Sequence, residues 1–103
     1  MNIYISGPMT GHPEFNYPAF RLAAHRLREL GYSVISPHEI EPYEKTWEGF
    51  MRADIKALMD CKKVATLAGW EESRGARIEV DLAKALGMEI VTIDSLVTEA
   101  ESA

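Results

Sequence analysis

Two segments of the sequence contain residue types that bind small polar ligands. The first lies near the N-terminus and consists of Ser6-Gly7-Pro8-Met9-Thr10-Gly11. Glycines let the backbone approach a ligand closely, and free N–H groups with Ser and Thr hydroxyls suit a phosphate or a sugar. The segment matches neither the P-loop, because no Lys-Ser/Thr pair follows, nor the fingerprint Gly-x-Gly-x-x-Gly. A tight turn between a strand and a helix explains it equally well.

The second segment combines a hydroxyl, a glycine and a carboxylate in Glu72-Ser73-Arg74-Gly75-Ala76-Arg77-Ile78-Glu79. Glu79 lies near the start of an expected helix, whose dipole favours the ionised form of the carboxyl group. A carboxylate held ionised beside a cleft is able to act as a nucleophile. The alternative is that Glu79 only stabilises the N-terminal part of its helix.

Two further polar side chains are candidates for a functional site. Asp54 lies in the middle of an expected helix, where aspartate is slightly unfavourable, so a functional role is one of two equal alternatives. The alternative is a solvated residue that pairs with Arg52 or Lys56. Tyr4 belongs to an apolar strand and is expected in the core, with a hydroxyl that is able to reach a cleft.

The histidines and the remaining aromatic residues give weaker signals. The three histidines do not have the spacing of metal ligands, and we expect structural or surface roles for His12, His25 and His38. Trp70 and Phe15 flank the expected cleft, where they either stack on a base or pack as part of the core or a lid.

Apolar runs alternate along the chain with segments of helical period. The expected strands are Asn2–Ser6, Tyr32–Ser36, Lys63–Leu67 and Glu89–Ile93. The expected helices run from an Asn16 cap to Leu30, from about Trp47 to Asp60 and from about Gly75 to Leu86. The tail Ser95–Ala103 is either a last short helix or a frayed end.

This alternation predicts an α/β fold, a small doubly wound parallel sheet of the flavodoxin or Rossmann type with four to five strands and helices on both faces. Right-handed crossovers favour the strand order 2-1-3-4. In such sheets ligands bind beyond the carboxyl ends of the strands, where the winding direction reverses. That point lies between the first and third strands, so the loops Gly7–Phe15 and Ala68–Gly75 flank the expected site.

The composition indicates one ordinary globular domain over residues 1–103, with 47% hydrophobic and 26% charged residues. A net charge of −5 disfavours binding to nucleic acid polymers. No apolar run is long enough to span a membrane, and we expect no signal peptide. The single cysteine, Cys61, is expected to be a buried apolar residue in a reducing compartment. We therefore expect a cytoplasmic protein.

The order and spacing of these segments resemble the nucleoside 2-deoxyribosyltransferase superfamily from Asn2 to about Ile93. The opening Ile3-Tyr4-Ile5-Ser6-Gly7-Pro8-Met9-Thr10-Gly11 is similar to its first strand and loop, and to a group of small phage and bacterial relatives. Asp54-Ile55-Lys56-Ala57-Leu58-Met59-Asp60 resembles the helix that carries a catalytic aspartate. Ser73-Arg74-Gly75-Ala76-Arg77-Ile78-Glu79-Val80 resembles the Gly-x-x-x-Glu helix of the family.

The resemblance implies a role for each matching residue. Glu79 corresponds to the family nucleophile, which attacks the anomeric carbon and forms a glycosyl-enzyme intermediate. Asp54 corresponds to the aspartate that hydrogen-bonds or protonates the leaving base, and Tyr4 to the tyrosine that positions the nucleophile. Water or a second base then resolves the intermediate, and no metal or organic cofactor is required.

Ser73 corresponds to a position that separates two branches of the superfamily. Transferases acting on free nucleosides have an aspartate there, against the sugar hydroxyl, whereas the 2'-deoxynucleoside 5'-monophosphate N-hydrolases have a serine against the phosphate. A hydroxyl donates to a phosphate that a carboxylate would repel, so the resemblance favours a nucleoside 5'-monophosphate as substrate. The candidates to complete the anion site are Arg74, Arg77, Gly11 and Thr10.

The sequence also departs from the family pattern. It is shorter than the transferases, so we expect it to be without the C-terminal residues with which they reach a neighbouring subunit's site. The loop Pro37–Thr46, expected to help select the base, matches nothing. Homo-oligomers are usual in the family and the core here is small, so we expect a dimer or a higher oligomer.

Three other functions compete with a nucleotide hydrolase. One is a deoxyribosyltransferase, and another is a non-catalytic module of the same fold that binds a nucleotide. The third is a phosphoacceptor domain, which requires an acidic pair after the first strand and an aspartate after the third. Ser6-Gly7-Pro8 and Ala68-Gly69 stand at those places, which nearly excludes it.

Overall fold

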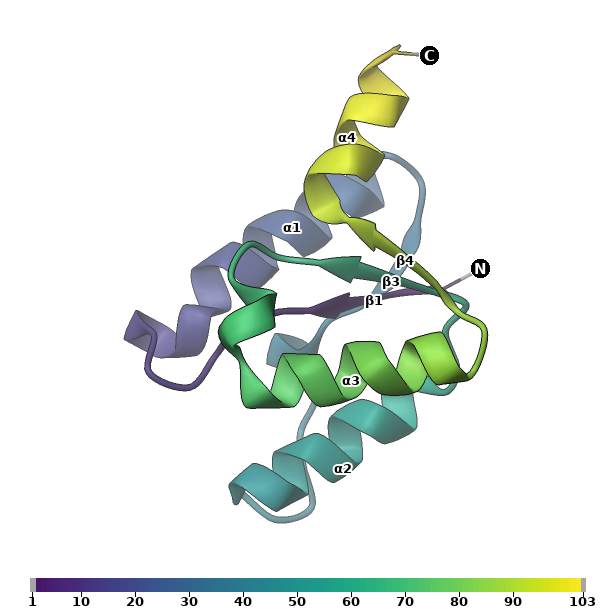
Figure 1. The fold of residues 1–103 in the computed structure, drawn as a ribbon. Coiled ribbons are helices and arrows are strands. Elements are labelled where there is room, and N and C mark those ends of the chain that lie inside the picture. The colour runs from purple at the N-terminus through teal and green to yellow at the C-terminus, as the bar shows by residue number, and fades with distance from the viewer. Residues whose placement is uncertain (1, 103) are drawn as a thin grey trace.

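A computed structural model describes residues 2–102, in which strands and helices alternate along the chain (Figure 1). The strands are β1 (Asn2–Ser6), β2 (Ser33–Ile35), β3 (Lys63–Thr66) and β4 (Glu89–Thr92). The α-helices are α1 (Tyr17–Glu29), α2 (Trp47–Leu58), α3 (Arg74–Ala85) and α4 (Ile93–Ser102). Short 3-10 turns cover Pro13–Asn16, Pro37–Glu39 and Trp70–Glu72. None of the helices in the described residues is long and apolar enough to cross a membrane.

The four strands form one parallel sheet in the order β2-β1-β3-β4. The α/β class, the four strands and their order confirm the prediction. In the register of the sheet, Tyr4 of β1 pairs with Ile35 of β2 and Val64 of β3, and Ser6 pairs with Thr66. The winding direction reverses between β1 and β3, so the carboxyl ends of these two strands define the expected crevice.

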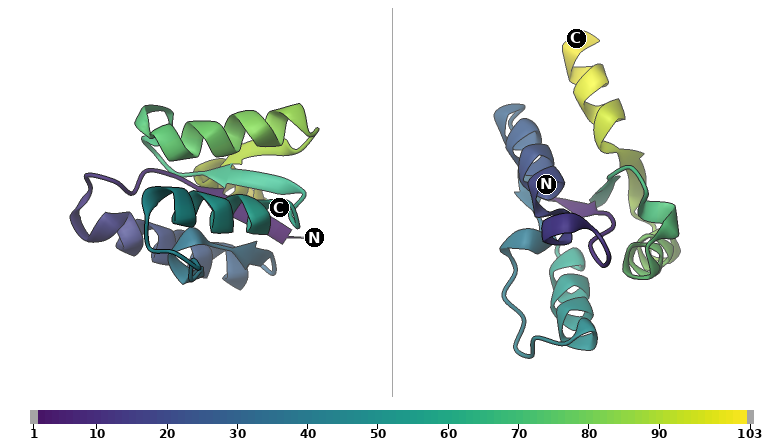
Figure 2. Two further views of the ribbon diagram at one scale, coloured as in Figure 1. Left: turned by 90° about the horizontal axis from the view of Figure 1, so that it is seen from below. Right: turned by 90° about the vertical axis from the view of Figure 1, so that its left-hand side faces the viewer.

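The two faces of the sheet are covered by different helices. Successive side chains of a strand point to opposite faces. Ile3 and Ile5 therefore pack in a cluster with residues of α1 and α4, whereas Tyr4 packs in a second cluster with residues of α2 and α3. Figure 2 shows α1 and α4 on one side of the strands and α2 and α3 on the other. Ser6, two residues after Tyr4, shares the face of α2 and α3.

Several element boundaries differ from the prediction by one or two residues. The second strand begins one residue later than expected because the Tyr32 N–H bonds to the Leu27 carbonyl at the end of α1, and it ends at Ile35. The fourth strand ends at Thr92 because Ile93 begins α4. For the tail, the helical alternative is correct: α4 buries Ile93, Leu96 and Val97, and Ala103 lies outside the described residues.

Asn16 precedes α1 as predicted, but its side chain does not cap the helix. Its backbone is left-handed, with φ of 61°, whereas a capping residue normally has extended backbone. Asn16 Nδ2 instead donates to the Pro8 carbonyl at 2.9 Å, so the side chain fastens the loop after β1 to the start of α1.

Candidate active site

A buried carboxylate lies over the end of β1 and accepts two hydrogen bonds from that strand. The Tyr4 hydroxyl donates to Glu79 Oε2 at 2.8 Å, and the Ser6 hydroxyl donates to Glu79 Oε1 at 2.7 Å. Both oxygens of the carboxyl group are therefore held by hydroxyls from one strand. The Glu79 side chain is left with a fixed orientation and one remaining lone-pair direction on each oxygen.

Local sequence patterns explain how these three side chains meet. Tyr4 and Ser6 are two residues apart on β1 and so point to the same face of the sheet. Glu79 belongs to the buried face of α3, together with Ala76, Val80 and Ala83. Glu79 is therefore buried, and it lies five residues beyond the first residue of α3.

Asp54 lies on the buried face of α2 and is only 6% exposed. The alternative that this side chain is solvated is therefore wrong. Among the described residues, Asp54 Oδ1 has no hydrogen-bond partner. A buried oxygen without a partner costs free energy unless it binds something else, so Asp54 has an unused acceptor or, when protonated, a free donor.

Burial controls the ionisation of this group of side chains. Burial raises the pKa of Glu79 to about 7, although the hydrogen bonds from Ser6 and Tyr4 act to lower it. Burial, followed by the nearby charge of Glu79, raises the pKa of Asp54 to about 8. The same two causes raise the pKa of the Tyr4 phenol well above its usual value, which keeps it a donor. Burial outweighs the expected helix-dipole effect on the pKa of Glu79. The dipole effect falls off within the first turn of a helix, and Glu79 lies beyond the first turn of α3.

The carboxyl groups belong to α2 and α3, which contact each other on this face of the sheet. Met51, Asp54 and Leu58 recur at helical spacing on α2, and Gly75, Glu79 and Ala83 do so on α3. A Cβ atom added to Gly75 would lie 3.0 Å from Met51 Sδ, so the Met51 side chain packs closely over this glycine. Gly75 therefore contributes helix packing, one turn before Glu79.

Comparison with known proteins gives the family of the chain. A family model described as "Domain of unknown function (DUF4406)" matches residues 1–92. The chain belongs to this family. No curated protein matches the chain.

The solved structures include a protein with the same fold as this DUF4406 domain. It is a "2-desoxiribosyltransferase from Leishmania mexicana", with a TM-score of 0.68 and 19% sequence identity. The match covers 88% of this chain and 62% of that protein, so the DUF4406 domain spans less than two thirds of its structural neighbour. At this identity the likeness establishes the fold, which agrees with the superfamily resemblance found in the sequence.

The other binding residues predicted in the loop after β1 lie either in a tight turn or at the surface. A Cβ atom on Gly7 would lie 2.8 Å from Leu67 Cβ, so a side chain at this position would clash with the residue that follows β3. Pro8 is buried, and Met9 packs against the cluster on the α1 and α4 face. Thr10 and Gly11 are exposed. Within the predicted segment Ser6–Gly11, Ser6 at the end of β1 is the residue that donates a hydrogen bond to Glu79.

The residues predicted before α3 lie at the start of that helix. Ser73 caps α3, because its hydroxyl oxygen accepts from the Ala76 N–H at 3.2 Å. Arg74 is exposed and lies over the ring of Trp47, with its Cζ atom 4.1 Å from the ring centroid. Arg77 is exposed on the next turn.

The weaker candidates take structural or surface positions. His25 pairs with Glu29 at 2.8 Å on the surface of α1, and Phe15 is 63% exposed. Trp70 packs against the cluster that contains Tyr4, and Cys61 is buried as expected. Within residues 2–102 no group of three or more His, Cys, Asp or Glu side chains is placed to hold a metal ion.

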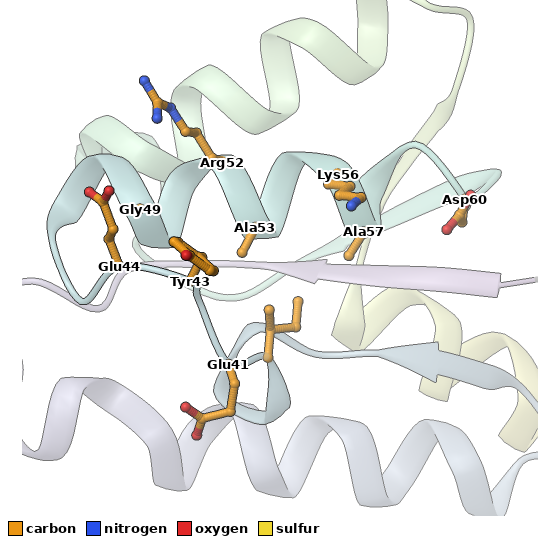
Figure 3. A pocket seen from close by; sticks show the side chains of 10 residues that line it. Glu41, Tyr43, Glu44, Gly49, Arg52, Ala53, Lys56, Ala57 and Asp60 are labelled. Atoms are coloured by element: carbon orange, nitrogen blue, oxygen red, sulfur yellow. The ribbon is translucent and has the colours of Figure 1, made fainter.

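A groove of about 520 Å³ runs between α2 and the loop that precedes it (Figure 3). It is lined by Ile40, Glu41, Tyr43, Glu44, Gly49, Arg52, Ala53, Lys56, Ala57 and Asp60. The groove includes part of the loop expected to select the base, but neither Glu79 nor Asp54 lines it. We place the candidate site at the carboxyl groups of Glu79 and Asp54. Both are buried and have raised pKa values, and neither lines the groove.

Two neighbours of the site were missed in the sequence, namely Trp47 and Met51. The signal was present: residues 47, 51, 54 and 58 recur at helical spacing and share one face of α2. The composition of α2 alone did not reveal that this face lies against α3.

Proposed function

We propose that this protein cleaves the N-glycosidic bond of a nucleoside 5'-monophosphate, with Glu79 as the nucleophile. The observation that supports this most directly is the hydrogen-bonded Glu79 carboxyl group beside buried Asp54. Between pH 7 and 8 their pKa values favour an ionised Glu79 and a protonated Asp54. A nucleophile and an acid require those opposite protonation states.

In the first step an oxygen of the Glu79 carboxylate attacks the anomeric carbon of the sugar. The bond from that carbon to the base nitrogen breaks, and its electron pair leaves with the base. Asp54 donates its proton to the departing base, which makes the base a better leaving group. The products of this step are a glycosyl ester of Glu79, the free base and an ionised Asp54.

In the second step water attacks the same carbon while Asp54 accepts one of its protons. The ester bond to Glu79 breaks, and the carboxylate is regenerated with the free sugar phosphate as product. This sequence is that of a retaining glycosidase, in which one residue serves first as acid and then as base. The Tyr4 and Ser6 hydroxyls hold the carboxylate in position throughout.

The phosphate of the substrate is assigned to the start of α3. The Ser73 hydroxyl accepts from the Ala76 N–H, and its own proton stays available to an anion. Arg74 and Arg77 are exposed on the first turns of the same helix, where their charges favour a phosphate. Thr10 and Gly11 after β1 are the further candidates for this anion site.

A deoxyribosyltransferase is the second candidate, and the name of the solved structure with this fold favours it. The first step would be the same, and a second base would replace water in the second step. A module that binds the nucleotide without cleaving it would use the same side chains for binding alone.

The test is chromatographic detection of free base from a panel of ribo- and deoxyribonucleoside 5'-monophosphates and nucleosides. We expect base release from monophosphates, reduced roughly 10⁴-fold by Glu79→Gln. Asp81→Asn, which neutralises an exposed carboxylate on the same helix, should have no effect. Exchange with an added base would support the transferase. Absence of release from every substrate would contradict catalysis.

A further inference from the structure

Trp47 and Arg74 meet at the outer end of the interface between α2 and α3. These are the first residues of α2 and α3, and the Arg74 guanidinium lies 4.1 Å from the centre of the Trp47 ring. One turn further in, Met51 packs over Gly75. Asp54 and Glu79 follow, with exposures of 6% and 4%. A ligand that enters between the helix starts must therefore displace this outer pair.

Arg74 is held at this place by the indole ring. Within residues 2–102, the Arg74 guanidinium forms no ion pair. It lies over the face of the Trp47 ring in a cation–π contact. A cation–π contact at an exposed site is weak, whereas a guanidinium and a phosphate form short, paired, charge-assisted hydrogen bonds. A phosphate at the start of α3 would therefore compete successfully with the ring for Arg74.

We infer that Trp47 and Arg74 form an exchangeable latch over the site: Trp47 holds Arg74 in the free protein, and the phosphate of a nucleotide draws Arg74 away. The inference rests on the proposed function for the identity of the ligand. Trp47 is a positioning residue in this scheme, because it acts through Arg74. The latch favours ligands that carry a phosphate, because a nucleoside without one has to break the contact between Trp47 and Arg74 without gaining a new partner for the guanidinium.

The fluorescence of Trp47 gives a direct test, because tryptophan emission responds to a charge next to the indole. The chain contains two tryptophans, so Trp70→Phe leaves Trp47 as the only one. Adding Glu79→Gln prevents turnover, and the double variant is titrated with a nucleoside 5'-monophosphate, the matching nucleoside and inorganic phosphate. Thermal unfolding of the double variant verifies that it is folded.

We expect the monophosphate to change the Trp47 emission in a saturable way and the nucleoside to leave it unchanged. Adding Arg74→Ala should give the altered emission before any ligand is added, and should weaken monophosphate binding about tenfold or more. Arg74→Lys should restore part of the response. Arg26→Ala, which removes an exposed cation on the opposite face of the sheet, should behave as the parent protein.

Equal responses to nucleoside and monophosphate would overturn the latch, as would an unchanged emission in Arg74→Ala. These outcomes are distinct from failure of the proposed function. A phosphate-dependent response in a protein whose wild type releases no base would support the latch and refute the catalysis. Base release without any change in Trp47 emission at saturating monophosphate would refute the latch and leave the catalysis standing.

Discussion

At the scale of residues, the candidate site depends on opposing influences on one carboxyl group. Burial favours the neutral form of Glu79, and the hydroxyls of Ser6 and Tyr4 favour the ionised form. The balance leaves its pKa at about 7, just below the value of about 8 for Asp54. Because the two groups interact, their titration belongs to the pair.

This balance predicts the pH dependence of base release. In the wild type, the coupled pair of carboxyl groups should give kcat/KM a narrow bell, with an acidic limb near pH 7 and a basic limb near pH 8. Ser6→Ala removes a hydrogen bond that stabilises the ionised form, so the acidic limb should move up by about one pH unit. An acidic limb at the same pH in both proteins would show that Ser6 does not control Glu79.

At the scale of elements, the site is made by the close approach of α2 and α3. Ser73 and Thr46 cap these two helices through hydrogen bonds to Ala76 and Gly49. Gly75 lets the helices approach until Met51 lies against the α3 backbone. This close contact lies one helical turn from Glu79.

This packing predicts the effect of side chains at Gly75. Gly75→Ala should change the free energy of unfolding by less than about 1 kcal/mol, because the atom that it meets ends a flexible side chain and alanine favours a helix. Gly75→Val should destabilise by about 1–3 kcal/mol through overpacking. Denaturant unfolding measures both. In a Met51→Ala background the cost of valine should fall, and an equal cost in both backgrounds would contradict the contact.

At the scale of the whole molecule, the two faces of the sheet have different compositions. The face covered by α1 and α4 contains an apolar cluster that includes Ile3 and Phe20. The face covered by α2 and α3 contains the buried carboxyl groups of Asp54 and Glu79. These carboxyl groups lie beside a second apolar cluster, which includes Leu58 and Val80.

This burial predicts how global stability depends on pH. The pKa of Asp54 is about 8 in the folded protein against an ordinary 3.8, so the folded state retains a proton that the unfolded state has lost. The free energy of unfolding should therefore fall as pH rises from about 4 to 8, by up to about 1.4 kcal/mol per pH unit for this group. Asp54→Asn should flatten that decline in denaturant unfolding. The exposed control Asp81→Asn should retain the wild-type slope, and an equal slope in all three proteins would refute the burial of a titrating Asp54.

The sequence by itself determined the fold class and the strand order, and it predicted Tyr4, Ser6, Asp54 and Glu79 as candidate site residues. Apolar periodicity gave the strands and helices, and the alternation of the two gave a parallel sheet with the order β2-β1-β3-β4. The period of a strand placed Tyr4 and Ser6 on one face. These features depend on residues close together in the chain, and side chains two or four residues apart are sufficient to reveal them.

The tertiary structure alone decided how the site residues interact. Tyr4 and Glu79 are 75 residues apart in the sequence, and only the crossing of α3 over β1 brings them to 2.8 Å. The pairing of Trp47 with Arg74 depends in the same way on the approach of α2 to α3. The pKa values of Asp54 and Glu79 depend on burial from several elements at once, and a desolvation cost of this kind has no local sequence pattern.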